Sequence, residues 1–198
     1  MGASFFVWTL ILSNVWVSRR GFNNPAFFQN YLFSISSLKL GDYKRLITSS
    51  FLHVDMSHLL FNMLTLFFFG DYIVSFFGGF YFYIIYFGSV LMGGLLSYAY
   101  HRNNNDYSAV GASGGVIGIL FAAILAFPDL KVGLLIVPIP MPGYVFVLLY
   151  IAYTLYGIRQ QKDSIGHAAH LGGAIGGVLF SSFVAPDIWG IWWQQISG

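Results

Sequence analysis

Long stretches without a charged side chain are the feature that most constrains how this chain can fold. Five such stretches contain no Asp, Glu, Lys or Arg: residues 1–18, 72–101, 107–128, 132–158 and 164–186. An α-helix needs about 20 mainly apolar residues to cross the hydrocarbon core of a bilayer. Charged residues make up only 8% of the chain, whereas soluble domains have about 25%. The sequence therefore predicts an integral membrane protein.

Breaks between the apolar stretches divide the chain into six predicted membrane helices. They cover approximately residues 3–18, 56–77, 80–100, 111–128, 143–158 and 166–186. Residues 19–55 form a long polar and aromatic connection, and the prolines within residues 130–143 exclude a helix there. Because lipid-exposed backbone must satisfy its hydrogen bonds internally, we expect an all-α polytopic membrane bundle. We expect one domain over residues 1–198, with a core at about 45–186.

Residue types that are absent also narrow the function. The chain has no cysteine, which excludes disulfides and thiol catalysis, and it has no glutamate. Its net charge is +2 and its basic residues are scattered, so nucleic acid is not an expected partner. The first apolar stretch lacks a basic leading segment and a small-residue cleavage site. We therefore predict a retained membrane helix there rather than a cleaved signal.

Three polar clusters open the second, fourth and sixth predicted helices. Their sequences are HVDMSHLLFN (53–62), GASGG (111–115) and GHAAHLGG (166–173). When the connections are followed along the chain, all three helices enter the membrane from the same side. Polar side chains inside a membrane are costly and usually mark function. Their convergence at one depth predicts a single site.

Ser113 lies in the motif Gly111-Ala112-Ser113-Gly114, where the fourth predicted helix begins. At that position its hydroxyl is near the backbone N–H groups of the first helical turn and the positive end of the helix dipole. Both features favour a developing oxyanion. The alternative is a packing face, because small residues are common where membrane helices touch. The short motif by itself favours that alternative.

His170 shares a helical stripe with Gly173 and Gly177, and Gly114 and Gly118 form a matching pair on the fourth predicted helix. Glycine pairs of this spacing let two helix backbones approach closely. We therefore expect the serine and the histidine at comparable depth. A histidine within hydrogen-bond reach of a serine can take the hydroxyl proton as a general base. The alternative is a histidine that makes only an interhelical hydrogen bond.

His58 and Asn62 are four residues apart, on one face at the start of the second predicted helix. Both side chains can donate hydrogen bonds to an oxyanion, and the loss of one such donor typically costs ~100- to 1000-fold in rate. The alternative is an interfacial histidine beside an interhelical amide. His53 and His167 lie outside these faces, and we expect either exposed loop residues or supports for the site.

The segments HVDMSHLLFN, GASGG and AHLGGAIGG, in this order, resemble the rhomboid family of intramembrane serine proteases. The resemblance covers roughly residues 45–180, and each motif opens the helix where the family has it. It implies a six-helix rhomboid-like bundle. It also implies an endopeptidase that acts in the lipid bilayer on transmembrane segments of other proteins, with no metal or organic cofactor.

By this resemblance, Ser113 is the nucleophile and His170 the general base of a catalytic dyad. His58, Asn62 and the backbone N–H of the serine hold the oxyanion, and Gly111 is the glycine that precedes the nucleophile. Attack on the scissile carbonyl gives an acyl-enzyme, which water then hydrolyses. The implied substrate is cut near the membrane boundary after a small residue. It must unwind first, because a helix hides its carbonyls.

Other positions agree with the family pattern or depart from it. Gly173 and Gly177 match the family's helix-packing glycines, and Arg45 resembles the basic residue of its first-loop structure. Lys44 stands where a tryptophan is common. Many relatives carry an aromatic residue four positions after the serine, against the histidine ring, and here that residue is Ile117.

Two other classes of function fit parts of the sequence. Histidines at converging helix starts suit a metal or haem site, but such a site leaves Gly111, Ser113 and Asn62 unexplained. Polar residues at interrupted helices suit a transporter, but the predicted helices show no repeated halves. Zinc proteases of the HExxH type need a glutamate. Aspartyl intramembrane proteases need two membrane Asp residues, and only Asp71 lies near a predicted span.

Two arguments disagree about orientation in the membrane. The family resemblance places both termini in the cytoplasm and the active site on the extracytoplasmic side of a bacterial inner membrane. Short loops rich in Lys and Arg usually stay in the cytoplasm, yet all basic residues except Lys131 fall in loops on the catalytic side. We expect the family orientation, because the first-loop basic residues can be held in a folded interfacial structure.

Overall fold

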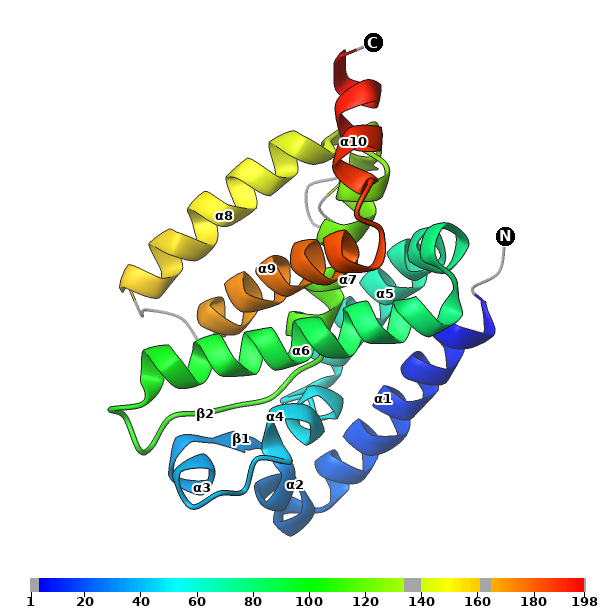
Figure 1. Ribbon diagram of the computed structural model, residues 1–198. Helices are drawn as coiled ribbons and strands as arrows, with labels where there is room; N and C mark the ends of the chain where they lie inside the picture. Colours follow the sequence, from blue (N-terminus) through cyan, green and yellow to red (C-terminus); the bar gives the residue numbers. More distant parts are fainter. Residues whose placement is uncertain (1–3, 134–139, 161–164, 198) are drawn as a thin grey trace.

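The computed structural model describes residues 4–133, 140–160 and 165–197, which are mostly helical (Figure 1). Its longer helices are α1 (Phe5–Asn23), α5 (Met56–Phe77), α6 (Gly79–His101), α7 (Ser113–Ala126), α8 (Gly143–Gln160) and α9 (His167–Val184). One of them lies in each of the six predicted segments, so the expected all-α fold is confirmed. Among the described helices, α5, α6 and α9 are long and apolar enough to cross a membrane, and α7 is a shorter apolar helix.

The structure differs from the predicted helices at one boundary and adds one helix. α1 continues past Arg19 and Arg20, because long basic side chains at a helix end can extend their charged groups to water without ending the helix. It stops where Asn24, in an extended conformation, precedes Pro25. Beyond the predicted end of the sixth helix, α10 (Ile188–Ser197) follows, and its first residue is buried against the end of α7.

The connection between α1 and α5 is folded rather than irregular. It contains α2 (Pro25–Tyr31), β1 (Phe33–Ser34), α3 (Ile35–Lys39), α4 (Arg45–Thr48) and the 3-10 helix η1 (Ser49–Phe51). β1 pairs antiparallel with β2 (Ser108–Ala109), in the segment that leads into α7. The first loop is therefore joined directly to the chain that carries Ser113.

Arg45 holds this first loop together. Its Nη1 donates to the backbone oxygens of Gln29 at 2.9 Å and Leu32 at 2.8 Å. Its Nε donates to Asp42 Oδ2 at 2.8 Å. That hydrogen bond, together with the charge of nearby Lys44, holds the pKa of the Asp42 carboxyl below its ordinary value. One guanidinium thus joins three separate parts of the loop.

The proline-rich connection at 130–143 lies partly outside the described residues. On either side of that gap, β3 (Lys131–Val132) pairs antiparallel with β4 (Met141–Pro142). The described part of the connection is thus a short hairpin-like pairing that leads into α8, and it contains no helix, as the prolines predict.

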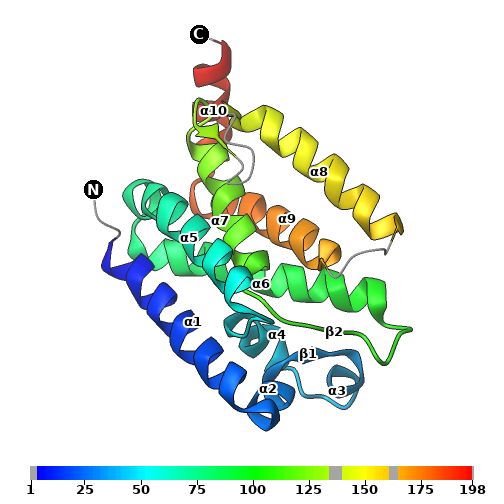
Figure 2. The same ribbon diagram turned by 180° about the vertical axis from the view of Figure 1, so that it is seen from behind.

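α7 runs through the middle of the bundle, in contact with α5, α6 and α9 (Figures 1 and 2). It is apolar on all sides, as expected for a fully enclosed helix, and all its residues except Ser113 and Ile117 are buried. α8 lies at the edge of the bundle, beside α9. The central position of α7 puts its first residue next to the starts of its neighbours.

Glycines bring the backbones of α7 and α9 into direct contact. A Cβ atom added at Gly173 would lie 2.1 Å from the carbonyl oxygen of Gly114. One added at Gly177 would lie 2.2 Å from the carbonyl oxygen of Gly118. Real side chains cannot approach so closely, so only glycine fits at these two positions of α9. The contact sets the depth of α9 relative to the start of α7.

Candidate active site

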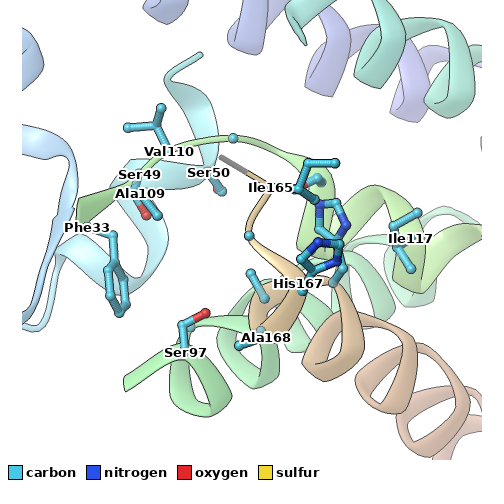
Figure 3. Close-up of a pocket in the computed structure, with 18 of the residues that line it drawn as sticks. Phe33, Ser49, Ser50, Ser97, Ala109, Val110, Ile117, Ile165, His167 and Ala168 are labelled. Atoms are coloured by element: carbon cyan, nitrogen blue, oxygen red, sulfur yellow. The ribbon is translucent and has the colours of Figure 1, made fainter. Parts of the chain in front are cut away.

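A cavity of about 1080 Å³ opens between the first loop and the starts of α5, α7 and α9. Of the residues singled out in the sequence, its lining includes His58, Asn62, Gly111, Ser113, Gly114 and His170. The other three, Gly118, Gly173 and Gly177, lie in the α7–α9 contact. In Figure 3, Phe33 and Ser49 stand on one side of the cavity, and Ile117 and His167 stand on the other. Side chains from three distant sequence motifs therefore share one space.

Gly111 creates the space next to Ser113. Its φ of +134° suits glycine, and its N–H donates to the backbone oxygen of Ser49 at 3.0 Å. A Cβ added here would lie 2.8 Å from His58 Nε2 and 3.7 Å from Ser113 Oγ. The imidazole of His58 and the hydroxyl of Ser113 thus border the same small gap, which any larger residue would fill.

The start of α5 fixes His58 and Asn62. Asp55 caps this helix, since its Oδ1 accepts from the backbone N–H of His58 at 2.7 Å. Asn62 is buried, and its Nδ2 donates to the backbone oxygen of His58 at 3.0 Å. An amide nitrogen carries two hydrogens, so the same group can also donate into the cavity that it lines.

His170 lies in the first turn of α9, where its backbone N–H donates to the Gly166 oxygen at 2.9 Å. Its ring is stacked with that of Tyr150 from α8, with centroids 6.4 Å apart and planes 24° apart. The sequence interpretation missed Tyr150. A signal was available, because Phe146 and Tyr150 are four residues apart and form an aromatic pair on one face of α8.

The sequence left open that His53 is an exposed loop residue, and the structure shows that this alternative is wrong. Its side chain is 0% exposed, and its Nε2 accepts from the backbone N–H of Ala112 at 3.4 Å. Because Nε2 accepts, the ring proton is on Nδ1, which lies 2.8 Å from Ser18 Oγ. That hydroxyl donates to the Phe51 oxygen at 2.9 Å. His53 therefore links α1 to the residue that precedes Ser113.

His167 is not an exposed loop residue either. It is buried at the start of α9. Its ring packs against Tyr153 of α8, with centroids 5.2 Å apart, and it fills the space beside Gly157. The small residue on α8 lets this imidazole fit between the two helices. His167 thus belongs to the α8–α9 contact.

We expect the stability of the fold to fall with acidity because of His53. Burial, with a smaller contribution from His58 and opposed by Asp55, lowers its pKa from 6.5 to about 3. Below pH 6.5 the unfolded chain binds a proton that the folded protein excludes. Stability present above that pH is therefore lost toward pH 3, by up to about 1.4 kcal/mol per pH unit. Thermal unfolding in detergent measures this loss.

The control for this pH dependence is His53→Gln, which keeps a polar side chain that does not titrate. Its unfolding temperature should fall less between pH 6.5 and pH 3 than that of the unmodified protein. The same pH dependence in both proteins would contradict the assignment to this residue.

Two pairs of histidine rings lie close together. The rings of His53 and His58 have centroids 4.9 Å apart, and those of His167 and His170 have centroids 6.5 Å apart. In the described part of the chain, no group of three or more His, Cys, Asp or Glu side chains could hold a metal ion. The alternative of a metal site thus has no cluster of ligands there.

Comparison with known proteins assigns this arrangement to a family. The family model described as the Rhomboid domain matches residues 40–187, which is most of the chain. The chain belongs to the rhomboid family. It is therefore an integral membrane protein with the helical bundle of that family, as its sequence motifs predicted.

Individual rhomboid relatives are similar over most of this chain. Rhomboid protein 1, mitochondrial, of Saccharomyces cerevisiae is 32% identical over 146 residues, covering 72% of this chain and 42% of that protein. RHOMBOID-like protein 12, mitochondrial, of Arabidopsis thaliana is 30% identical over 182 residues, covering 83% of this chain and 54% of that protein. Rhomboid protease GluP of Bacillus subtilis is 29% identical over 143 residues, covering 72% and 26%. The chain spans about half the length of the first two relatives.

Proposed function

We propose that this rhomboid chain is an intramembrane serine endopeptidase, with Ser113 as nucleophile and His170 as general base. The observation that carries the proposal is the single cavity lined by both residues together with His58 and Asn62. The relative named as a rhomboid protease supports it. We further propose that residues 1–198 form one rhomboid-like domain, with its core at about 45–186.

The proposed reaction is acyl transfer. His170 takes the hydroxyl proton of Ser113 as Oγ attacks the scissile carbonyl carbon. The carbonyl oxygen becomes an oxyanion, which accepts hydrogen bonds from His58, Asn62 and the backbone N–H of Ser113. The amine leaves with the proton from His170, and water then hydrolyses the acyl-enzyme by the reverse sequence of proton transfers.

The start of α7 supports the proposed role of Ser113. As the first residue of the helix, it lies among backbone N–H groups that have no acceptor within the helix. These groups and the helix dipole stabilise negative charge. Gly111 leaves room beside the hydroxyl and the His58 ring, where the substrate carbonyl oxygen would lie. The chemistry requires no metal or organic cofactor.

The proposed substrates are transmembrane segments of other membrane proteins. The cavity is formed at the starts of apolar helices, so a substrate reaches it from the surrounding lipid bilayer. Peptide carbonyls within a helix are hydrogen-bonded and hidden by side chains. The segment must therefore unwind near the membrane boundary before Ser113 attacks, and small residues at the cleavage point ease that access.

A fluorophosphonate probe, which bonds covalently to an activated serine, tests this function. We expect it to label the purified protein and to leave Ser113→Ala unlabelled. Ser36→Ala, which removes an exposed serine of the first loop, serves as the matched control and should be labelled normally. Equal labelling of Ser113→Ala and the unmodified protein would refute the proposed nucleophile.

We also propose that the protein lies in a bacterial inner membrane with its active site on the extracytoplasmic side. The basic residues that argue for the opposite orientation are partly tied into the folded first loop. Arg45 is held by three hydrogen bonds, and Lys39 Nζ donates to Asn105 Oδ1 at 2.8 Å. Alkaline-phosphatase fusions after Arg102 should be active and those after Gly198 inactive. The reverse pattern would overturn this orientation.

A further inference from the structure

We propose that Tyr150 of α8 is a positioning residue for His170. Its ring lies beside the His170 imidazole and comes from a different helix than either dyad residue. The inference rests on the proposed function, because it concerns the general base of the same dyad.

The first support is the geometry of the two rings. Their centroids are 6.4 Å apart and their planes differ by only 24°. Offset-stacked rings typically have centroids about 4.5–7 Å apart. Tyr150 thus lies beside the His170 imidazole, with its ring plane nearly parallel to that of the histidine. The second dihedral of a histidine side chain has broad energy wells, so a ring packed beside the imidazole restricts its orientation.

The second support is that Tyr150 is itself held in place. Phe146, one turn earlier on α8, is stacked with it at a centroid distance of 5.5 Å and an angle of 26°. Phe121 of α7 contacts its edge at 5.6 Å and 66°. Both phenylalanines are buried, at 6% and 3% exposed. The tyrosine ring is therefore held by two buried neighbours, and it lies nearly parallel to the rings of both Phe146 and His170.

The third support is that the neighbouring side chain from α7, Ile117, is not aromatic. Ile117 follows Ser113 by one helical turn, lines the cavity and packs against the same apolar cluster as Tyr150. In Figure 3 it lies on the side of the cavity where α9 begins. An isoleucine has no ring to stack on an imidazole. The aromatic surface that faces His170 comes from α8.

A turnover assay with a transmembrane substrate tests the proposal. We expect Tyr150→Leu to lower kcat ~10- to 100-fold with little change in KM, since the ring orients the base rather than binding substrate. Tyr150→Phe should retain kcat, because it keeps the ring. Adding Ile117→Tyr to Tyr150→Leu should restore most of kcat, because it returns an aromatic ring to the histidine from α7. A purely structural role for Tyr150 predicts no such rescue.

Tyr156→Leu is the matched control, because it makes the same change at an exposed position of the same helix, where the side chain is 63% exposed. Its kcat and KM should equal those of the unmodified protein. If Tyr150→Leu does not fold, Tyr150→Met keeps the apolar volume on a flexible chain and should show the same loss.

Normal kcat in Tyr150→Leu or Tyr150→Met would overturn the positioning role. Equal losses in Tyr150→Leu and Tyr150→Phe would also overturn it, because the effect would then belong to the hydroxyl. Both results leave the proposed function intact as long as turnover of the unmodified protein depends on Ser113. If that dependence is absent, the proposed function fails, and the positioning role fails with it.

Discussion

Ser113→Ala and His170→Ala are each expected to abolish cleavage of a transmembrane substrate, and the double variant should be little worse than either. Without its oxygen nucleophile the enzyme cannot form the acyl intermediate, and without a base the hydroxyl remains a weak nucleophile. Residues that act as one unit are strongly non-additive, and loss of a single member can cost ~10⁶-fold in kcat. The measurement is turnover by the three purified variants.

Thermal unfolding of each dyad variant separates loss of chemistry from loss of fold. Both residues are only partly buried, so we expect all three variants to unfold near the temperature of the unmodified protein. Ser36→Ala again provides the serine control. Substantial turnover by Ser113→Ala, or losses that multiply in the double variant, would show that the two residues do not act together.

The helices could be predicted because the bilayer imposes a simple rule on sequence. A membrane-spanning segment must be long, apolar and uncharged, and this pattern located α5 and α6 to within a residue or two. The rule was less informative about the residue at which each helix ends. Arg19 and Arg20 were taken as the end of α1, although a basic side chain at an interface can stay on the helix.

The first loop could not be predicted, because single long-range contacts determine its structure. The hydrogen bonds from Arg45 reach back 13 and 16 residues to backbone oxygens. β1 is only two residues long, and its partner β2 lies beyond two membrane helices. Neither feature produces a periodic pattern of apolar and polar residues, which is the signal that sequence interpretation relies on.

The histidines show the same limit within the candidate site. A helical face indicates which residues of one segment share a side, and so it grouped His58 with Asn62. It does not indicate what lies opposite. The backbone partner of His53 is Ala112, 59 residues away, and the ring opposite His170 belongs to Tyr150 on another helix. Those neighbours follow from how the helices pack.

Gly173→Ala is expected to reduce turnover severely. The added methyl group would lie 2.1 Å from the carbonyl oxygen of Gly114, and a helix backbone cannot turn aside as a flexible side chain can. α7 and α9 must therefore separate. Gly114 adjoins Ser113, and Gly173 is one turn from His170, so the separation displaces the dyad. A displacement of about 1 Å can cost ~100-fold in rate.

The matched variant is Gly114→Ala, which adds a methyl group on the α7 side of the same contact. A Cβ added at Gly114 would be 3.5 Å from its nearest neighbour, the Ala169 oxygen, which is an ordinary contact distance. Gly114→Ala should therefore keep most of the turnover, although the two glycines have equivalent places in the sequence pattern. Full activity in Gly173→Ala, or equal losses in both variants, would show that the helices do not meet through the α9 glycine. The asymmetry arises because each helix presents a different side of its backbone to the other, and of these two glycines only Gly173 would bring its Cβ into overlap with a carbonyl oxygen.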